Sequence, residues 1–239
     1  ARLRVRLDLA TRGPDAARAG AAALLAAGHG GRHAAILRRV AGEHGPSVRP
    51  KVFVVGLSRT GTTTLTVALR QLGYLAAHWA NPATGHLLTA ADAALFDAMT
   101  DATAAEAVEE LADRHPGARF VLTLRPAETW VGSLLSHMRR EHGVADADAL
   151  GRLLDSGAPL LFGGRWAEIY RRQLLPPGGL AAAPAAHAAR VRARFRDEPG
   201  RLLEFDLWAG HGWDRLCGFL GLPAPREAFP RANTGPARG

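Results

Sequence analysis

The chain has 239 residues with 47% hydrophobic and 22% charged side chains, a composition that excludes disorder, collagen and a coiled coil as descriptions of the whole. Its single cysteine excludes an internal disulfide framework and a cysteine-based zinc cluster. The net charge of +8 is concentrated in residues 1–50, where nine arginines stand against three acidic residues. Because the remaining chain is nearly neutral, a basic nucleic-acid-binding module is only an alternative, and we expect no nucleic-acid partner.

The apolar runs of the sequence are all short. None approaches the ~20 residues that are needed to cross a bilayer, and no signal-peptide core precedes the first of them. We therefore expect a cytoplasmic protein without a membrane span.

Residues 1–50 are predicted to form a helical appendage or linker of unknown role. Residues 16–27 and 32–40 have helical composition and are separated by glycines. Gly45, Pro46 and Pro50 then end this segment. The second unit is predicted to run over residues 51–239.

Strands alternate with helices in this second unit. Residues 52–55 are a β-branched and aromatic run, typical of a parallel strand buried on both faces, and a helix is expected over 62–72. Further strands are expected at 119–124 and 201–205. Further helices are expected at 104–114, 126–140, 146–155, 165–175, 181–195 and 212–220. The alternation predicts an α/β fold, in which helices flank a parallel sheet in three layers as in P-loop NTPases.

A short polar loop, Gly56 to Gly61, connects the first strand to its helix. Such a loop directs successive backbone N–H groups at one point, beside a helix N-terminus that carries roughly half a positive charge. Arg59 adds a permanent cation that can hold an anionic oxygen through two hydrogen bonds. Hydroxyl donors follow at Thr60, Thr62, Thr63 and Thr64. The loop is therefore predicted to bind a phosphate-like anion.

The spacing of these two glycines matches the start of a Walker A loop, but Thr62 stands where that motif has lysine. Lys51 is the only lysine of the chain. A lysine-less P-loop kinase or other nucleotide-binding enzyme is therefore an alternative. It would need Mg²⁺ and an acidic residue at a strand end, whereas the strand at 119–124 is followed by Arg125.

Three segments resemble those of sulfotransferases that use 3′-phosphoadenosine 5′-phosphosulfate (PAPS). The run VVGLSRTGTTTL, residues 54–65, is similar to their 5′-phosphosulfate loop, with Arg59 where many members have lysine. Arg125 at a strand end with Ser133 eight positions later resembles their 3′-phosphate motif. Residues 212–233 resemble the closing segment of a bacterial and fungal subfamily, and the likeness as a whole covers residues 51–233.

The resemblance implies transfer of a sulfuryl group from PAPS to a hydroxyl or amine of a small-molecule or carbohydrate acceptor, without a metal ion. The product would be adenosine 3′,5′-bisphosphate, and a homo-oligomer is compatible with the sequence. The residues that the resemblance assigns to the nucleotide are Ser58, Arg59, Thr60, Gly61, Thr62, Thr63, Thr64, Arg125, Ser133, Arg231 and Asn233. Arg59 would also stabilise the charge that develops during transfer.

An acceptor hydroxyl or amine must lose its proton, which requires a histidine or carboxylate near the sulfate. His78 matches a histidine commonly found in the subfamily, and Asp101 lies at a family acidic position. The usual Asp-Trp-Pro of that position is altered to Asp-Ala-Thr. The alternatives are a surface histidine and a helix N-cap aspartate, and either residue is a candidate for the general base.

Other polar and aromatic residues receive plainer interpretations. Trp79 is expected to pack against its neighbours, to stack on adenine or to line the acceptor pocket. Trp166 and Tyr170 are expected in the core. Solvent-facing positions are expected for His86, His137, His142 and the arginines at 190, 192, 194 and 196.

Overall fold

In the computed structural model, the structure describes residues 14–28, 34–42, 49–82, 85–156 and 164–232. Within them, five strands form one parallel sheet in the order β2-β3-β1-β4-β5. The strands are β1 (Val52–Val54), β2 (Ala76–His78), β3 (Ala98–Thr100), β4 (Arg119–Leu124) and β5 (Leu202–Asp206). The predicted α/β fold with a parallel sheet is confirmed.

The helices follow the predicted alternation closely. They are α2 (Pro14–Ala26), α3 (Ala34–Val40), α4 (Thr62–Gln71), α5 (Ala102–Glu106), α6 (Val108–Arg114), α7 (Ala127–His142), α8 (Ala147–Asp155), α9 (Gly164–Leu174), α10 (Gly179–Arg194) and α11 (Trp213–Leu220), with 3-10 turns η2 (Ala90–Ala94) and η3 (Pro199–Arg201). The helix expected at 104–114 is two helices, because the backbone leaves the helical conformation at Ala107.

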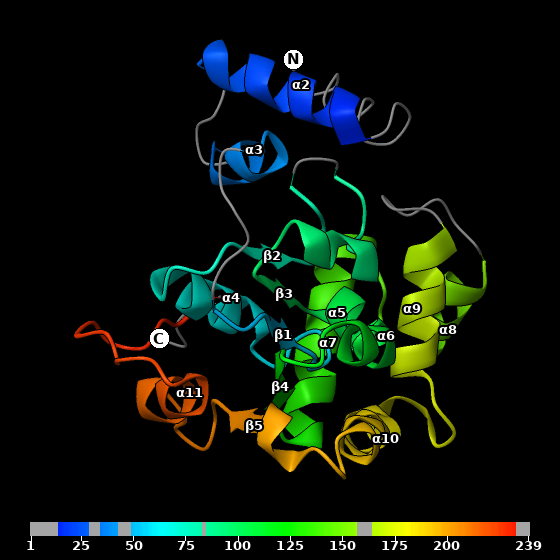
Figure 1. Ribbon diagram of the computed structural model, residues 1–239. Coiled ribbons are helices and arrows are strands. Elements are labelled where there is room, and N and C mark those ends of the chain that lie inside the picture. The colour runs from blue at the N-terminus through cyan, green and yellow to red at the C-terminus, as the bar shows by residue number, and fades with distance from the viewer. Residues whose placement is uncertain (1–13, 29–33, 43–48, 83–84, 157–163, 233–239) are drawn as a thin grey trace.

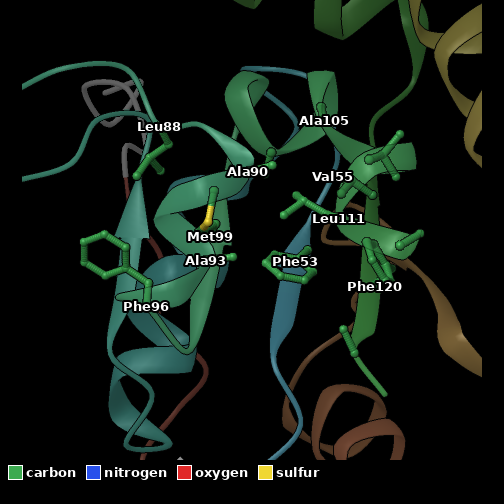
Figure 2. Close-up of a cluster of buried hydrophobic side chains, with 14 of the residues drawn as sticks. Phe53, Val55, Leu88, Ala90, Ala93, Phe96, Met99, Ala105, Leu111 and Phe120 are labelled. Carbon is green, nitrogen blue, oxygen red and sulfur yellow. The ribbon is translucent and has the colours of Figure 1, made fainter. Parts of the chain in front are cut away.

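Side chains of β1 alternate between the two faces of the sheet and so create two cores. Val52 and Val54 pack with buried residues of α4 and α11 on one face. Phe53 and Val55 face the other way, into the cluster of Figure 2, which includes Leu111 of α6 together with residues of α5 and α10. Helices thus cover both faces, which gives the expected three layers.

A third buried cluster joins α7, α8 and α9 beside the carboxyl end of the sheet. Its largest members are Trp130, Met138, Trp166 and Tyr170. Because Leu57 of the polar loop belongs to the same cluster, these helices are packed directly against the loop.

Helices α2 and α3 stack on the side of the sheet that begins with β2 (Figure 1). Ala21 and Leu37 belong to the same buried cluster as Phe53, and Arg39 forms a 2.6 Å ion pair with Asp97. No helix in the described part of the chain has the length and apolar character to cross a membrane.

The arginine-rich helix α10 lies on the outside of the sheet. Three of its arginines form ion pairs with acidic residues: Arg190 with Glu109, Arg192 with Glu204, and Arg194 with Asp113 and Glu198. The positive charge of this helix is therefore largely matched within the protein.

Candidate active site

The carboxyl ends of the parallel strands meet one cavity of about 1200 Å³. Along this edge, β2 ends in His78, β3 is followed by Asp101, and β1 leads into the loop that carries Arg59. β4 is followed by Arg125, and Trp208 comes after β5. All five residues line the cavity, so the sheet arranges four predicted site residues in strand order and adds Trp208, which the sequence analysis did not single out.

Two glycines allow the loop after β1 to take its shape. A Cβ at Gly56 would lie 1.8 Å from the Thr123 hydroxyl oxygen, so no other residue fits without displacement. Gly61 has φ 97° and begins α4 without a side-chain capping hydrogen bond. The first-turn amides of α4 are consequently left for an outside acceptor, which is the arrangement of an anion site.

The loop hydroxyls divide into two groups. Thr62, Thr63 and Thr64 line the cavity, as does Ser58. Thr60 does not line it: its hydroxyl donates to the Leu57 carbonyl at 2.6 Å and contacts Thr123 at 2.6 Å. The side chain of Thr60 therefore holds the loop in shape.

Ser58 connects the loop to β3 and α9. Its Oγ donates to Asp101 Oδ1 at 2.7 Å and lies 3.0 Å from the Tyr170 hydroxyl. Burial, and then the charge of Asp101, raise the pKa of Tyr170, so its phenol stays protonated. Because Ser58 uses its own hydroxyl proton on Asp101, the phenol O–H is the donor in the hydrogen bond with Ser58. The indole N–H of Trp130 donates to the Ser58 carbonyl at 2.8 Å. Ser58 is thereby fixed from three sides.

Two arginines converge on the cavity from neighbouring strands. Arg59 Nε donates to Ser133 Oγ at 3.4 Å, and Arg125 Nη1 donates to the Arg59 carbonyl at 3.0 Å. Burial, and then the nearby charge of Arg59, lower the pKa of Arg125, which remains a cation at neutral pH. The guanidinium of Arg125 lies 4.4 Å from the ring centre of Trp208. Within the described residues neither arginine forms an ion pair with an acid, so both charges are left for a ligand.

The C-terminal segment closes one side of the cavity. Arg231 and Ala232 line it, and the backbone of Ala232 is hydrogen-bonded in both directions to the Thr64 hydroxyl at 3.2 and 3.3 Å. Asn233, the other residue expected to close over the nucleotide, lies outside the described residues.

His78 and Asp101 form a pair on the opposite side of the loop from Arg125. His78 Nε2 is 3.2 Å from Asp101 Oδ2 and 3.2 Å from the Thr63 hydroxyl. The remaining oxygen of Asp101 accepts from Ser58 and from the Ala102 amide, which makes Asp101 the N-cap of α5 as well. The two base candidates are thus neighbours.

Two hydroxyls hold His78 on the side of Nδ1. Its Nδ1 lies 2.8 Å from the Thr100 hydroxyl and 3.3 Å from that of Thr66, and these two hydroxyls are 2.7 Å apart. Thr66 donates to the Thr62 carbonyl at 2.8 Å. Both ring nitrogens of His78 therefore have hydrogen-bonding partners, which fixes the orientation of the ring.

Backbone strain is concentrated at this site. Among the described residues, the non-glycine residues with positive φ are Arg59 (71°), Trp79 (66°) and Asp101 (82°). All three line the cavity. Each such residue costs about 1–3 kcal/mol, and strain of this kind persists where the surrounding structure imposes it, as at functional sites.

Some cavity residues differ from their sequence interpretation. His137 and His142, expected to face solvent, line the cavity, whereas His86 is exposed as expected. Burial, and then Arg59, lower the pKa of His137. Helical spacing could have found it, because His137 lies four residues after Ser133 on α7. Trp166 is buried in the core as expected and also lines the cavity.

The structure also bears on the kinase alternative. β3, which the sequence did not reveal, is followed by an acid, Asp101, beside β1. Its oxygens are already engaged by Ser58, the Ala102 amide and His78. Lys51 lies at the other end of β1, where it donates to the Phe96 carbonyl at 2.9 Å, so the described part of the loop contains no lysine.

Comparison with known proteins agrees with this geometry. The family model described as a sulfotransferase domain matches residues 51–237. "Ava biosynthesis cluster protein M" of Aspergillus versicolor is 28% identical over 215 residues, with coverage of 77% of this chain and 81% of that protein. The family match includes every strand of the sheet and every residue discussed at the cavity. The chain therefore belongs to the sulfotransferase domain family.

Proposed function

We propose that this sulfuryl transferase uses PAPS as its donor and a hydroxyl or amine of a small-molecule or carbohydrate compound as its acceptor, without a metal ion. The observation that carries the proposal is the pair Arg59 and Arg125, which have no acidic partner among the described residues and share one cavity with the two candidates for the base, His78 and Asp101. Residues 51–239 would be the catalytic domain, and residues 1–50 an appendage.

The residues present fit a nucleotide with phosphates at two positions. The uncapped first turn of α4 and Arg59 would hold the 5′-phosphosulfate. Arg125 would hold the 3′-phosphate, with Ser133 as a hydroxyl donor. The stacking of Arg125 on Trp208 restricts that guanidinium to one side of the cavity. When bound, PAPS supplies the sulfuryl group that is transferred.

The protein's own contribution to such a transfer is positioning and electrostatic stabilisation. Arg59 and the loop amides are placed to stabilise the negative charge that develops on the sulfuryl oxygens and on the departing phosphate oxygen. They are fixed before the reaction, since Ser58 and Thr60 hold the loop through buried hydrogen bonds. A preorganised donor loses little free energy to rearrangement during the reaction.

The acceptor proton would go to Nε2 of His78. In this proposal the neutral ring carries its proton on Nδ1, where it donates to the Thr100 hydroxyl at 2.8 Å, and Nε2 offers its lone pair to the acceptor in the cavity. The imidazolium formed would lie 3.2 Å from Asp101 Oδ2, which stabilises the new positive charge. This gives the two candidates distinct roles: His78 acts as the base and Asp101 as its electrostatic partner.

Calorimetric titration with nucleotides tests the donor. Adenosine 3′,5′-bisphosphate should bind without Mg²⁺ and more tightly than AMP, ADP or ATP, by roughly 10²–10⁴-fold for two charge-assisted contacts. Arg125→Ala should remove most of this preference and Ser133→Ala less of it, while Arg152→Ala, at an exposed position of α8, should have no effect. Tight binding of Mg·ATP with no preference for the 3′-phosphate would favour the kinase instead.

A further inference from the structure

Trp79 holds a large side chain in a backbone conformation that suits glycine or asparagine. Its φ is 66°, and both backbone groups are tied down, the amide to Thr100 at 3.2 Å and the carbonyl to the Leu88 amide at 3.1 Å. A bulky residue in this region is a true outlier, because Cβ crowds the backbone. The indole is thus kept at the cavity against a local preference for a smaller residue, and such strain points to function.

Trp79 begins a continuous aromatic wall along the cavity. Its ring packs edge-on against Tyr170, with 5.7 Å between the ring centres. Tyr170 stacks on Trp166 with 4.5 Å between ring centres, and the ring centres of Trp166 and His142 are 5.3 Å apart. All four residues line the cavity. Tyr170 and Trp166 are only 5% and 3% exposed, and the Tyr170 hydroxyl is hydrogen-bonded to Ser58, so these two rings support Trp79, whose ring is partly exposed at the cavity.

Three polar side chains of α7 that line the same cavity are engaged with one another. Arg140 Nε donates to Glu141 at 2.9 Å, and Arg140 Nη2 lies 3.2 Å from His137 Nδ1. A sugar presents several hydroxyls, each of which needs a partner when it is buried. The wall therefore suits a flat ring with few polar groups better than it suits a carbohydrate.

The sheet order places this wall on the acceptor side. β2, which ends next to Trp79, is separated from β4 and Arg125 by two intervening strands. At ~4.8 Å per strand, the two strand ends are on the order of 14 Å apart. His78, the proposed base, directly precedes Trp79. A ring held by Trp79 is thus beside the base and away from the 3′-phosphate position.

We propose that Trp79, backed by Tyr170 and Trp166, forms an aromatic slot that selects a planar aromatic hydroxyl compound as acceptor, with its hydroxyl directed to His78. This inference rests on the proposed function and narrows its acceptor class. Trp79 is the specificity-determining residue of the slot, because its ring is the one next to the base.

Matched binding probes test the slot without any turnover. 2-Naphthol and its saturated counterpart decahydro-2-naphthol share a hydroxylated two-ring skeleton, but only the first is aromatic. Calorimetric titration into protein saturated with adenosine 3′,5′-bisphosphate should show tighter binding of 2-naphthol by roughly two- to tenfold, the value of an aromatic contact beyond its apolar area. Equal affinities, or tighter binding of methyl β-glucoside than of 2-naphthol, would overturn the proposal.

Three substitutions at Trp79 distinguish the effect of its ring on ligand binding from its effect on folding. Trp79→Leu should abolish the discrimination between the two probes, and Trp79→Phe should keep most of it. Trp79→Gly should weaken the binding of 2-naphthol, and it should lower the thermal unfolding midpoint less than Trp79→Leu does for the packing it removes, because glycine relieves the strained φ. If Trp79→Leu does not fold, the Phe and Gly variants give the same comparison. Discrimination that survives in both Leu and Gly variants would overturn the role of Trp79.

The nucleotide affinity of the same samples distinguishes the two levels of proposal. Trp79→Leu should leave the Kd for adenosine 3′,5′-bisphosphate within about twofold, and a loss as large as that for 2-naphthol would place Trp79 at the nucleotide and overturn the slot. A wild-type protein that prefers the 3′-phosphate but not the aromatic probe refutes the slot alone. A wild-type protein without the 3′-phosphate preference refutes the proposed function.

Discussion

Replacement of Asp101 by asparagine tests the division of roles between the two base candidates. The side-chain oxygen of Asn would keep the hydrogen bonds from Ser58 and the Ala102 amide, and its NH₂ would take the place of the oxygen beside His78 Nε2. That NH₂ donates to the lone pair which should receive the acceptor proton. Asn also tolerates positive φ, so Asp101→Asn should fold normally.

The expected loss follows from the geometry of the pair. Two unit charges 3.2 Å apart attract by about 5 kcal/mol at an effective dielectric constant near 20. Because the side chains of His78 and Asp101 are 26% and 11% exposed, solvent screens part of this attraction. Roughly half of it, about 2–3 kcal/mol, corresponds to a fall of roughly 30- to 150-fold in kcat.

The assay is release of adenosine 3′,5′-bisphosphate from PAPS with any acceptor that supports turnover, measured across pH. Asp101→Asn should lower kcat and leave the Kd for adenosine 3′,5′-bisphosphate nearly unchanged. Asp113→Asn, which removes a carboxylate from a surface ion pair, is the matched control and should behave as wild type. An unchanged kcat for Asp101→Asn, or a changed nucleotide affinity at constant kcat, would refute the assigned role.

Three further predictions concern the loop, the base and the strand end. Arg59→Ala should lower kcat by roughly 10²–10³-fold with a smaller effect on nucleotide affinity, and near-normal turnover would remove Arg59 from the mechanism. Thr100→Val should lower kcat about tenfold, and Thr100→Ser should restore it, because the hydroxyl is hydrogen-bonded to His78 Nδ1 and orients the ring; equal rates in both variants would contradict this positioning role. Burial lowers the pKa of His187 although its Nε2–H donates to the Val55 carbonyl, so the folded state favours the neutral ring. Its contribution to stability is therefore lost as the pH falls below the ~6.5 of an unfolded histidine. His187→Gln, whose amide can donate to the same carbonyl, should reduce that loss by up to about 1.4 kcal/mol per pH unit in urea unfolding, and an unchanged pH dependence would exclude His187 as its source.

The sequence predicts strands β1, β4 and β5 better than β2 and β3, which form one side of the sheet. β4 and β5 were found within one residue because their runs of large apolar side chains are distinctive. β2 (Ala-Ala-His) and β3 (Ala-Met-Thr) are three residues long, and half of their residues are alanine, which has little strand preference. They form strands because β3 pairs with β1 and β2 pairs with β3. Without β3, the sequence does not show that Asp101 follows a strand end beside the loop.

The part of the candidate site that the sequence predicts best is the loop after β1, because its characteristic residues are close together in the sequence. The glycines and Arg59 stand within six residues, so their joint purpose is legible in one loop. The aromatic wall could not be predicted from the sequence, because Trp79 and Trp166 come from distant segments and are joined only through Tyr170 in the folded chain. The strain at Trp79 likewise depends on contacts with Thr100 and Leu88 that only the folded chain provides.

The order of the strands has a consequence for evolution and engineering. Arg59 and Arg125 depend on β1 and β4, whereas Trp79 depends on β2 and is joined to the α9 aromatics. Mutations at sites more than ~7–10 Å apart combine almost additively only where they share no partner. Tyr170 is such a shared partner, because it contacts Trp79 and Trp166 and its hydroxyl lies 3.0 Å from Ser58 of the loop. A library randomised at Trp79 and His142, with Tyr170 and Trp166 retained, would therefore search for new acceptors with the least effect on the proposed nucleotide site. A lineage that retained Tyr170 could diversify its acceptors in the same way without changing its donor.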